Sequence, residues 1–491
     1  MCPNAAVGDD VDHVLYRRLD PAAVRYPRGD EPNPYVRYRT LFLAYHAARA
    51  LGWSDGQYVD LVELLDEAVA LVDGHGFRVT PFARDAALSE RLGFSERGGV
   101  FVKDETGGVS GSHKARHLMG TLIELEIAGA TQRPGRDSGA WPRHPLAIAS
   151  CGNAALAAAV VARAAGRALE VFVPTHADAA VVERLRALEA RITTCERVPG
   201  VSGDPTYHRL LEAIAGGAVP FTCQGNLNGL AIEGGETLGF EIVSYLATAG
   251  QRLDRLVVQV GGGALASSCV RAFEDARELG VPVDLPRIHA VQTRGGYPLV
   301  RAYRRLADRL LPPGGDASAT RDPEPGRSHP DLAAPGAFPA AGVGEDRAAH
   351  LRALLRTEHG MTILRDAACH RSAFMWPWEE EPHSMAGGIL DDETYDWLAV
   401  VQGMLASGGY PLVVDEPTVA EANDLARAAT GIDVDHTGSA GLAGLLALVR
   451  DGGISPDETV AVLFTGIRRE LESPPSSGRL PGSHPERSER S

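Results

Sequence analysis

Two patterns of apolar residues alternate along the chain: continuous apolar runs and apolar residues at helical spacing. The run Pro145–Ser150 leads into a glycine turn, Ala154–Ala165 has apolar residues at helical spacing, and Leu169–Pro174 is apolar again. A strand, a turn, a helix and a second strand in this order form the unit of a parallel β-sheet. The pattern returns between residues 233 and 293 and between residues 394 and 464. It predicts an α/β fold.

The same spacing predicts the individual elements. The predicted strands are Gly99–Lys103, Pro145–Ser150, Leu169–Pro174, Leu256–Val260, Ile288–Thr293, Pro411–Val414 and Thr459–Phe464. The predicted helices are Tyr38–Leu51, Tyr58–Val72, Asp85–Leu92, Lys114–Ala128, Ala154–Ala165, Ala179–Ala190, Glu233–Ala249, Leu265–Leu279, Thr394–Ala406, Thr418–Ala429 and Ala440–Val449.

Three stretches lack either pattern. Residues 1–35 are polar and rich in proline, which predicts a loosely ordered lead-in. Residues 311–345 are rich in Pro, Gly, Asp and Ala, and we expect a long insertion loop or lid there. Residues 472–491 are rich in Ser, Pro, Gly and Arg and are predicted to be a disordered tail.

Composition and charge narrow the class of protein. The net charge of −16 argues against a nucleic-acid or anionic-membrane partner, because both favour basic patches. Residues 1–12 lack the apolar centre of a signal peptide, and no apolar run is long enough to span a bilayer. The 6 cysteines contain no CxxC pair, which favours a reducing compartment over a disulfide or zinc framework. We expect a soluble, cytoplasmic protein without a metal site.

The distribution of basic residues singles out two positions. Lys103 and Lys114 are the only lysines, and every other one of the 48 basic residues is arginine. Arginine does not deprotonate in proteins and cannot add to an aldehyde, whereas a desolvated lysine can. A lysine kept in such a chain indicates chemistry that needs a primary amine, such as formation of a Schiff base.

The surroundings of Lys114 favour it for this role. The hydroxyl-rich turn Ser110, Gly111, Ser112 precedes the predicted helix, and Ser112 is the expected N-cap. Lys114 would then lie in the first helical turn, where free backbone N–H groups attract an anion such as a phosphate. The alternative is a solvated lysine at an ordinary junction of loop and helix.

Three turns that follow predicted strands would face one crevice, because ligands collect at the carboxyl ends of parallel strands. In the turn Ser150–Asn153, Asn153 can donate a hydrogen bond to a phenolic oxygen, or it forms a plain Asx turn. The glycine turn beginning at Gly261 suits a single phosphate better than a dinucleotide, or it is only a structural turn. Thr465 could donate to an unprotonated pyridine nitrogen, or it is a solvated strand end.

These motifs together resemble the fold-type II pyridoxal-phosphate enzymes of the tryptophan synthase β-subunit superfamily. The segments that carry the resemblance are Val102–Glu105 with the later SGSHKARH, Ser150–Asn153, Ile232–Ile242, Val434–Gly444 and Leu463–Gly466. The last two resemble the C-terminal motifs of threonine synthases and threonine dehydratases. The resemblance implies two open, mostly parallel twisted sheets flanked by helices, with an N-terminal helical extension.

The resemblance also implies a domain division and a set of site residues. The expected parts are an extension at 1–76, a large domain at 77–110 and 235–470 with an insertion at 311–382, a small mobile domain at 111–234, and a tail at 471–491. Lys114 would anchor pyridoxal 5'-phosphate and act as the base. The expected cofactor contacts are His113, Asn153, Gly261, Gly262, Gly263, Ala264, Leu265 and Thr465, and the expected substrate contacts are Ser110, Gly111 and Ser112.

The substrate is left open by departures from the family pattern. His113 precedes the lysine as in tryptophan synthase β-subunits, where the dehydratase branch has Phe, and Cys151 lies inside the asparagine turn. We expect a homodimer that eliminates ammonia from a small amino acid such as serine, threonine or a β-substituted alanine. The alternatives are a β- or γ-replacement synthase, a non-catalytic partner subunit, and a nicotinamide oxidoreductase built on the Gly261 turn.

The cofactor can be tested by colour. We predict that the purified protein is yellow and shows the visible absorbance band of a lysine-bound cofactor, and that Lys114→Ala lacks this band. A wild-type protein that stays colourless after addition of pyridoxal phosphate would contradict the prediction.

Overall fold

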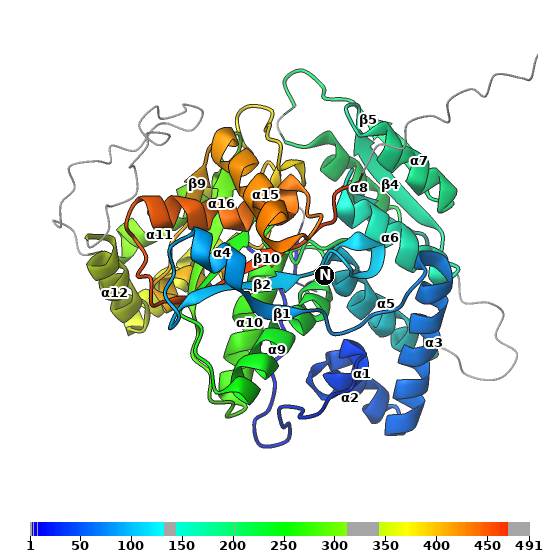
Figure 1. Ribbon diagram of the computed structural model, residues 1–491. Coiled ribbons are helices and arrows are strands. Elements are labelled where there is room, and N and C mark those ends of the chain that lie inside the picture. Colours follow the sequence, from blue (N-terminus) through cyan, green and yellow to red (C-terminus); the bar gives the residue numbers. More distant parts are fainter. Residues whose placement is uncertain are drawn as a thin grey trace, which may run out of the picture.

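The computed structural model describes residues 2, 4–6, 8–131, 144–201, 203–311 and 343–469. Its framework is two β-sheets flanked by helices (Figure 1). The predicted α/β fold with two open, mostly parallel sheets is confirmed. The helices are α1 Pro34–Arg37, α2 Leu43–Ala50, α3 Asp55–Asp73, α4 Ala86–Arg91, α5 Lys114–Thr131, α6 Asn153–Ala164, α7 Ala179–Ala187, α8 Pro205–Ala215, α9 Leu230–Ala249, α10 Ala264–Glu278, α11 Pro298–Leu310, α12 Val343–Leu355, α13 Glu358–Cys369, α14 Trp397–Ser407, α15 Glu416–Thr430 and α16 His436–Arg450.

The larger sheet has 6 strands in the order β1-β2-β10-β7-β8-β9. Only the edge strand β1 runs antiparallel to its neighbour. Alternate residues of a strand face opposite sides, so Leu256 and Val258 of β7 pack under α9 and α10, while Val257 packs under α16. Both faces are therefore covered, as all-apolar strands require. The strands are β1 Phe82–Asp85, β2 Gly99–Asp104, β7 Arg255–Gln259, β8 Arg287–Thr293, β9 Leu412–Val414 and β10 Thr459–Phe464.

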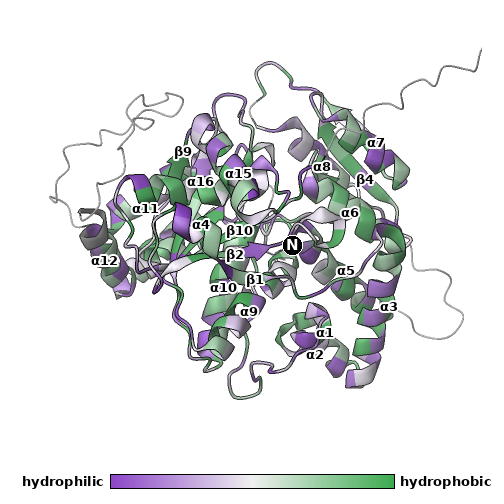
Figure 2. Ribbon diagram, viewed as in Figure 1, coloured by the Kyte–Doolittle hydropathy of each residue, from purple (hydrophilic) through white to green (hydrophobic). Residues whose placement is uncertain are grey.

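The smaller sheet has 4 parallel strands in the order β5-β4-β3-β6. Leu146 and Ile148 of β3 join the core that contains α5 and α6, whereas Ala147 faces a smaller cluster with Leu210 of α8. The strand β4 is coloured as hydrophobic in Figure 2, and hydrophilic residues colour much of the outlying helix α7. The strands are β3 Leu146–Ala149, β4 Leu169–Pro174, β5 Arg191–Cys195 and β6 Val219–Pro220.

Two helices in close contact connect the region of Lys114 to the larger sheet. A Cβ atom on Gly120 of α5 would lie 2.6 Å from the Cα of Gly234 on α9. A Cβ on Gly234 would lie 2.4 Å from the Arg116 carbonyl oxygen. Both positions need glycine, because the two helix backbones touch there. The start of α5 is thus held directly against α9.

The N-terminal segment is more firmly attached than the sequence indicated. Residues 8–33 contain no helix or strand, as expected of a lead-in. However, the buried Arg17 pairs with Glu233, Glu236 and Asp275, at 3.0, 2.6 and 2.9 Å. These ion pairs contradict the interpretation of this segment as loosely ordered. Composition could not reveal them, because their partners lie far away in the chain.

The prediction of a single helix at Tyr38–Leu51 is also wrong. The backbone is extended at Phe42 (φ −94°, ψ 138°), which separates the short turns before it from α2. The Tyr35 and Phe42 rings stack with centroids 5.8 Å apart, and the Leu43 N–H bonds the Glu233 carboxylate at 2.6 Å. Tertiary packing therefore overrides the helical spacing.

The region expected to be an insertion contains regular structure. Helices α12 and α13 occupy residues 343–369 and pack with α11 and α14 on the larger sheet. They were not predicted, because no sustained apolar spacing was recognised there. Residues 312–342 of the expected loop and the expected tail at 471–491 lie outside the described residues. Among the helices that are described, none is both long and apolar enough to cross a bilayer.

The contact between α5 and α9 gives a stability test with an internal control. Gly120→Ala should lower the free energy of unfolding by about 1–3 kcal/mol, because the new methyl group overlaps the α9 backbone. Gly129→Ala on the same helix meets nothing within 4 Å and should raise it by about 0.5–1 kcal/mol. Urea unfolding of both variants measures the difference, and equal effects would contradict the packing argument.

Candidate active site around Lys114

The loop before Lys114 lies along the end of strand β10. The His113 N–H donates to the Thr465 carbonyl at 3.2 Å, and the Ile467 N–H donates to the Gly111 carbonyl at 2.8 Å. Ser112 and Gly466 form an antiparallel bridge between these two segments. The structure therefore places the predicted residues of the lysine loop beside Thr465, although about 350 residues separate them in the chain.

Asn153 reaches the same place from the smaller sheet. It is the first residue of α6, and a Cβ on Gly466 would lie 2.6 Å from its amide nitrogen. Arg469 donates to the Asn153 amide oxygen at 2.7 Å and to the Ser110 carbonyl at 2.6 Å. Arg469 was missed in the sequence, because it follows the last strand in a stretch without any motif. It is a cation in direct hydrogen-bond contact with the loop that is expected to hold a carboxylate.

Gln259 determines how the Thr465 hydroxyl can be used. Its amide nitrogen donates to the carbonyls of Gly438 and Leu463, at 2.8 and 3.1 Å, and contacts Thr465 Oγ1 at 2.7 Å. An amide nitrogen can only donate, so the Thr465 oxygen is the acceptor in this contact. Its own hydrogen is left to donate to another group. This is the arrangement that an unprotonated pyridine nitrogen would need.

The glycine turn between β7 and α10 lies under the segment 389–396. Gly263 has a left-handed backbone (φ 97°), and α10 begins at the next residue, Ala264. A Cβ on Gly261 would lie 2.5 Å from a carboxylate oxygen of Asp391, and a Cβ on Gly262 would lie 3.5 Å from it. The Asp391 side chain therefore lies directly against the turn. Backbone N–H groups at such a turn, followed by a helix N-terminus, fit a phosphate.

Several polar atoms around the lysine loop are buried without a hydrogen-bond partner among the described residues. They are the hydroxyls of Ser110 and Ser112 and the Nε2 atom of His113. Ser112 therefore does not cap α5 as the sequence predicted. Buried polar groups are normally satisfied, so these atoms indicate the binding of a polar ligand.

Burial and the Lys114 ammonium together shift the pKa of neighbouring groups. Burial lowers the pKa of His113 well below its ordinary value and that of His117 to about 3, and Lys114 lowers both further. Burial raises the pKa of Asp391 to about 6 and that of Asp396 to about 8, and Lys114 opposes both shifts. Groups with strongly shifted pKa values gather at functional sites. Asp391 and Asp396 were not recognised in the sequence, because they reach the site only through the fold. His117 follows Lys114 by one helical turn and was not singled out.

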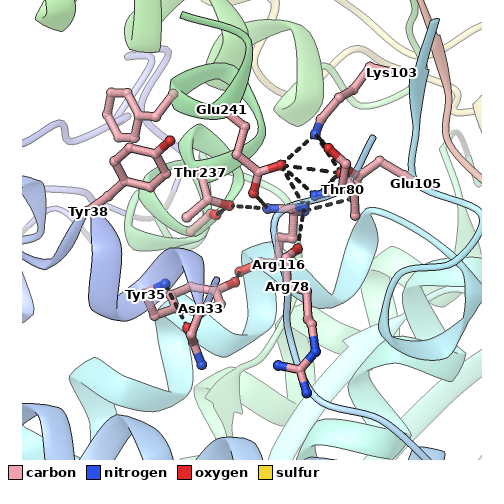
Figure 3. A network of polar contacts seen from close by, with 12 residues as sticks. Asn33, Tyr35, Tyr38, Arg78, Thr80, Lys103, Glu105, Arg116, Thr237 and Glu241 are labelled. Atoms are coloured by element: carbon pink, nitrogen blue, oxygen red, sulfur yellow. Dashed lines mark hydrogen bonds and ion pairs between the residues drawn. The ribbon is translucent and has the colours of Figure 1, made fainter. Parts of the chain in front are cut away.

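The second lysine is fixed in a buried network of charges. The Lys103 amine bonds Glu241 and Thr80, and Arg116 bonds Glu105 at 2.7 Å and Glu241 at 2.6 Å. Figure 3 shows these side chains pointing toward one another between β2, α5 and α9. An amine that is fully buried in ion pairs has no access to an aldehyde. Lys114 is therefore the lysine available for such chemistry.

A cavity of about 290 Å³ lies on another side of the same loop. Its lining includes Thr80, Glu105, Ser112 and Arg116, but not Lys114, Asn153, Thr465 or the glycine turn. The candidate site therefore lies where the lysine loop meets Thr465 and Asn153, and not in this cavity.

Comparison with known proteins establishes the family. The model of the family "Pyridoxal-phosphate dependent enzyme" matches residues 75–375. The chain belongs to the pyridoxal-phosphate dependent enzymes. Its cofactor is pyridoxal 5'-phosphate, and the predicted membership of the fold-type II group is confirmed.

Relatives of this pyridoxal-phosphate-dependent enzyme carry out different reactions. A threonine synthase of Methanosarcina acetivorans is 23% identical over 412 residues, covering 84% of this chain and 78% of the relative. An aspartate racemase structure matches with a TM-score of 0.52 and 16% identity, covering 84% of this chain and 97% of that one. Threonine deaminase isoform 2 of Solanum lycopersicum matches with a TM-score of 0.50 and 14% identity, covering 85% and 92%. The structural likenesses show the fold alone.

The residues of this chain fit the cofactor. Lys114 would hold its aldehyde carbon, and the turn from Gly261 to Leu265 would hold its phosphate, as the Asp391 carboxylate there indicates. Thr465 would donate to the ring nitrogen, and Asn153 lies beside Gly466 where it could contact the ring.

The two lysines should differ sharply in a stability test. Lys103→Met should lower the free energy of unfolding by about 3–5 kcal/mol, because it removes one cation from a buried network. Arg163→Met, which breaks an exposed pair with Glu189, should cost about 1 kcal/mol or less. Urea unfolding measures both. Lys103→Met should still bind the cofactor at Lys114, and loss of that binding would contradict the assignment.

Proposed function

We propose that this protein catalyses α,β-elimination from a small amino acid such as serine, threonine or a β-substituted alanine. The observation that carries the proposal is the position of Lys114. It is the one lysine outside the buried network, and it follows a loop whose unpartnered hydroxyls lie beside Thr465 and Asn153.

When bound at Lys114, pyridoxal 5'-phosphate supplies an aldehyde that condenses with amines and a ring that accepts the electron pair released at Cα. The Lys114 amine is the base that takes the proton from Cα. The buried neighbours His113 and His117 remain neutral near pH 7, because their pKa values are lowered.

The substrate carboxylate would bind at the Ser110–Ser112 turn. The hydroxyls of Ser110 and Ser112 are buried donors that find no partner within the described part of the chain, and Arg469 lies close by through its bond to the Ser110 carbonyl. A carboxylate held by hydroxyls and backbone donors keeps the Cα–H bond in a fixed direction relative to Lys114. Fixed geometry of this kind supplies a large part of catalysis.

The Thr465 hydroxyl adds a constraint on the reaction. As a neutral donor, it favours an unprotonated ring nitrogen, whereas a carboxylate would hold that nitrogen protonated. A neutral donor at this position would suit a reaction in which the β-substituent leaves as Lys114 takes the Cα proton, because little charge then accumulates at Cα. Thr465 therefore supports elimination over reactions in which that charge must persist.

A replacement reaction is the second candidate. The threonine synthase from Methanosarcina acetivorans, similar over 84% of this chain, favours it. In a replacement reaction a second nucleophile adds where the substituent has left. Elimination and replacement therefore differ in what enters the site after the first half of the reaction.

A panel of amino acids tests the proposal. Serine, threonine and β-chloroalanine should release ammonia and a 2-oxo acid in equal amounts, and the product is measured with and without an added thiol. Lys114→Ala should lower the rate by about 10²- to 10⁴-fold or more, because it loses the base. A thioether product formed in place of the 2-oxo acid would assign replacement. Absence of both products with every amino acid would contradict the proposal.

A further inference from the structure

Asp391 lies where the cofactor phosphate is expected. Its carboxylate oxygen would be 2.5 Å from a Cβ on Gly261 and 3.5 Å from one on Gly262, so it rests against the backbone of the glycine turn. Free backbone N–H groups at such a turn, followed by a helix N-terminus, attract anions. In this structure a side chain of the protein itself supplies the anion.

The segment around Asp391 is tied down on both sides. The Asp396 N–H donates to the Gly262 carbonyl at 2.9 Å, and the Asp396 carboxylate accepts from the Gly225 N–H at 3.2 Å. The Gly388 N–H donates to the Thr437 hydroxyl at 3.0 Å. Residues 388–396 therefore form a strap over the turn, with Asp391 directed at it.

We propose that the Asp391 carboxylate takes the place of the cofactor phosphate in the cofactor-free protein, so that cofactor binding exchanges one anion for another at the Gly261–Gly263 turn. The inference rests on the proposed function and on the turn as the place of its cofactor phosphate. The two anions compete for the same place at the turn, and an ionised carboxylate left beside the phosphate would repel it. Asp391 therefore weakens cofactor binding through the phosphate and not through the aldehyde.

The protonation state of Asp391 controls this competition. Burial raises its pKa to about 6, the Lys114 ammonium and the Gly262 backbone lower it, and Asp204 and Asp392 raise it. The other titratable groups that sense its charge are Cys151, Cys223 and Tyr395. Because the pKa is raised, the carboxyl is neutral below about pH 6 and ionised above it. Competition with the phosphate is therefore strongest above pH 6.

The experiment compares two aldehydes that differ only in the phosphate. Dissociation constants of pyridoxal phosphate and of pyridoxal are measured by absorbance for the full-length apo-protein, Asp391→Asn and Asp392→Asn. The ratio of the two constants isolates the contribution of the phosphate. Asp392→Asn is the matched control, because its carboxylate contacts Arg197 at 3.4 Å instead of the turn. Thermal unfolding of each apo-variant shows that it is folded, and borohydride reduction with peptide mapping identifies the labelled lysine.

At pH 8, Asp391→Asn should increase the preference for the phosphorylated aldehyde by about tenfold or more, and Asp392→Asn should leave it unchanged. At pH 5.5 the advantage of Asp391→Asn should largely disappear. The titration of the phosphate itself is common to all proteins and cancels in the comparison. If Lys114 is labelled but Asp391→Asn keeps the wild-type preference at pH 8, the inference is overturned and the proposed function stands. If Lys114 is not labelled, the proposed function and the inference both fail.

Discussion

The position of the candidate active site depends on a cluster of buried charges. Lys103 and Glu105 come from β2 and the residue after it, Arg116 from α5 and Glu241 from α9. Removing charges from water is costly, and buried ion pairs are stable only when each member keeps its partners. The cluster therefore holds these three elements in one arrangement. Arg116 lies two residues after Lys114, so the same arrangement determines where the Lys114 side chain begins.

The two lysines show how the same residue type is given opposite roles. Lys103 is enclosed by carboxylates and a hydroxyl, where its charge is stabilised and its amine is inaccessible. Lys114 instead follows a loop in which the Ser110 and Ser112 hydroxyls are buried without hydrogen-bond partners among the described residues. A lysine can act as a nucleophile and a base only where its amine is not enclosed by such ion pairs. The structural role of Lys103 and the chemical role of Lys114 therefore follow from the surroundings of each lysine and not from the residue type.

Much of the framework could be predicted from the sequence because it depends on local patterns. Strands such as β4 and β10 are continuous apolar runs, and the glycine turn and the lysine loop have recognisable spacings. The residues that were missed act over long distances. Asp391, Arg469 and Gln259 contribute through partners far away in the chain, and α12 and α13 follow directly on a Pro- and Gly-rich stretch that favoured a loop. The break at Phe42 likewise follows from packing that a local pattern does not contain.

The anchoring of Arg17 bears on where this protein can be shortened. Three carboxylates, on α9 and α10, are buried around that one guanidinium, and burial raises the pKa of Glu233 to about 7 and of Glu236 to about 8 even with Arg17 present. A shortened chain that starts at the first helix would keep these acids and lose Arg17, while Arg271 would still pair with Glu236 and Asp275. Without Arg17 the pKa values of Glu233 and Glu236 would rise further, because burial would be opposed by one positive charge fewer. A change at this end of the chain, such as proteolytic trimming, consequently affects buried ion pairs, although the segment has no regular secondary structure.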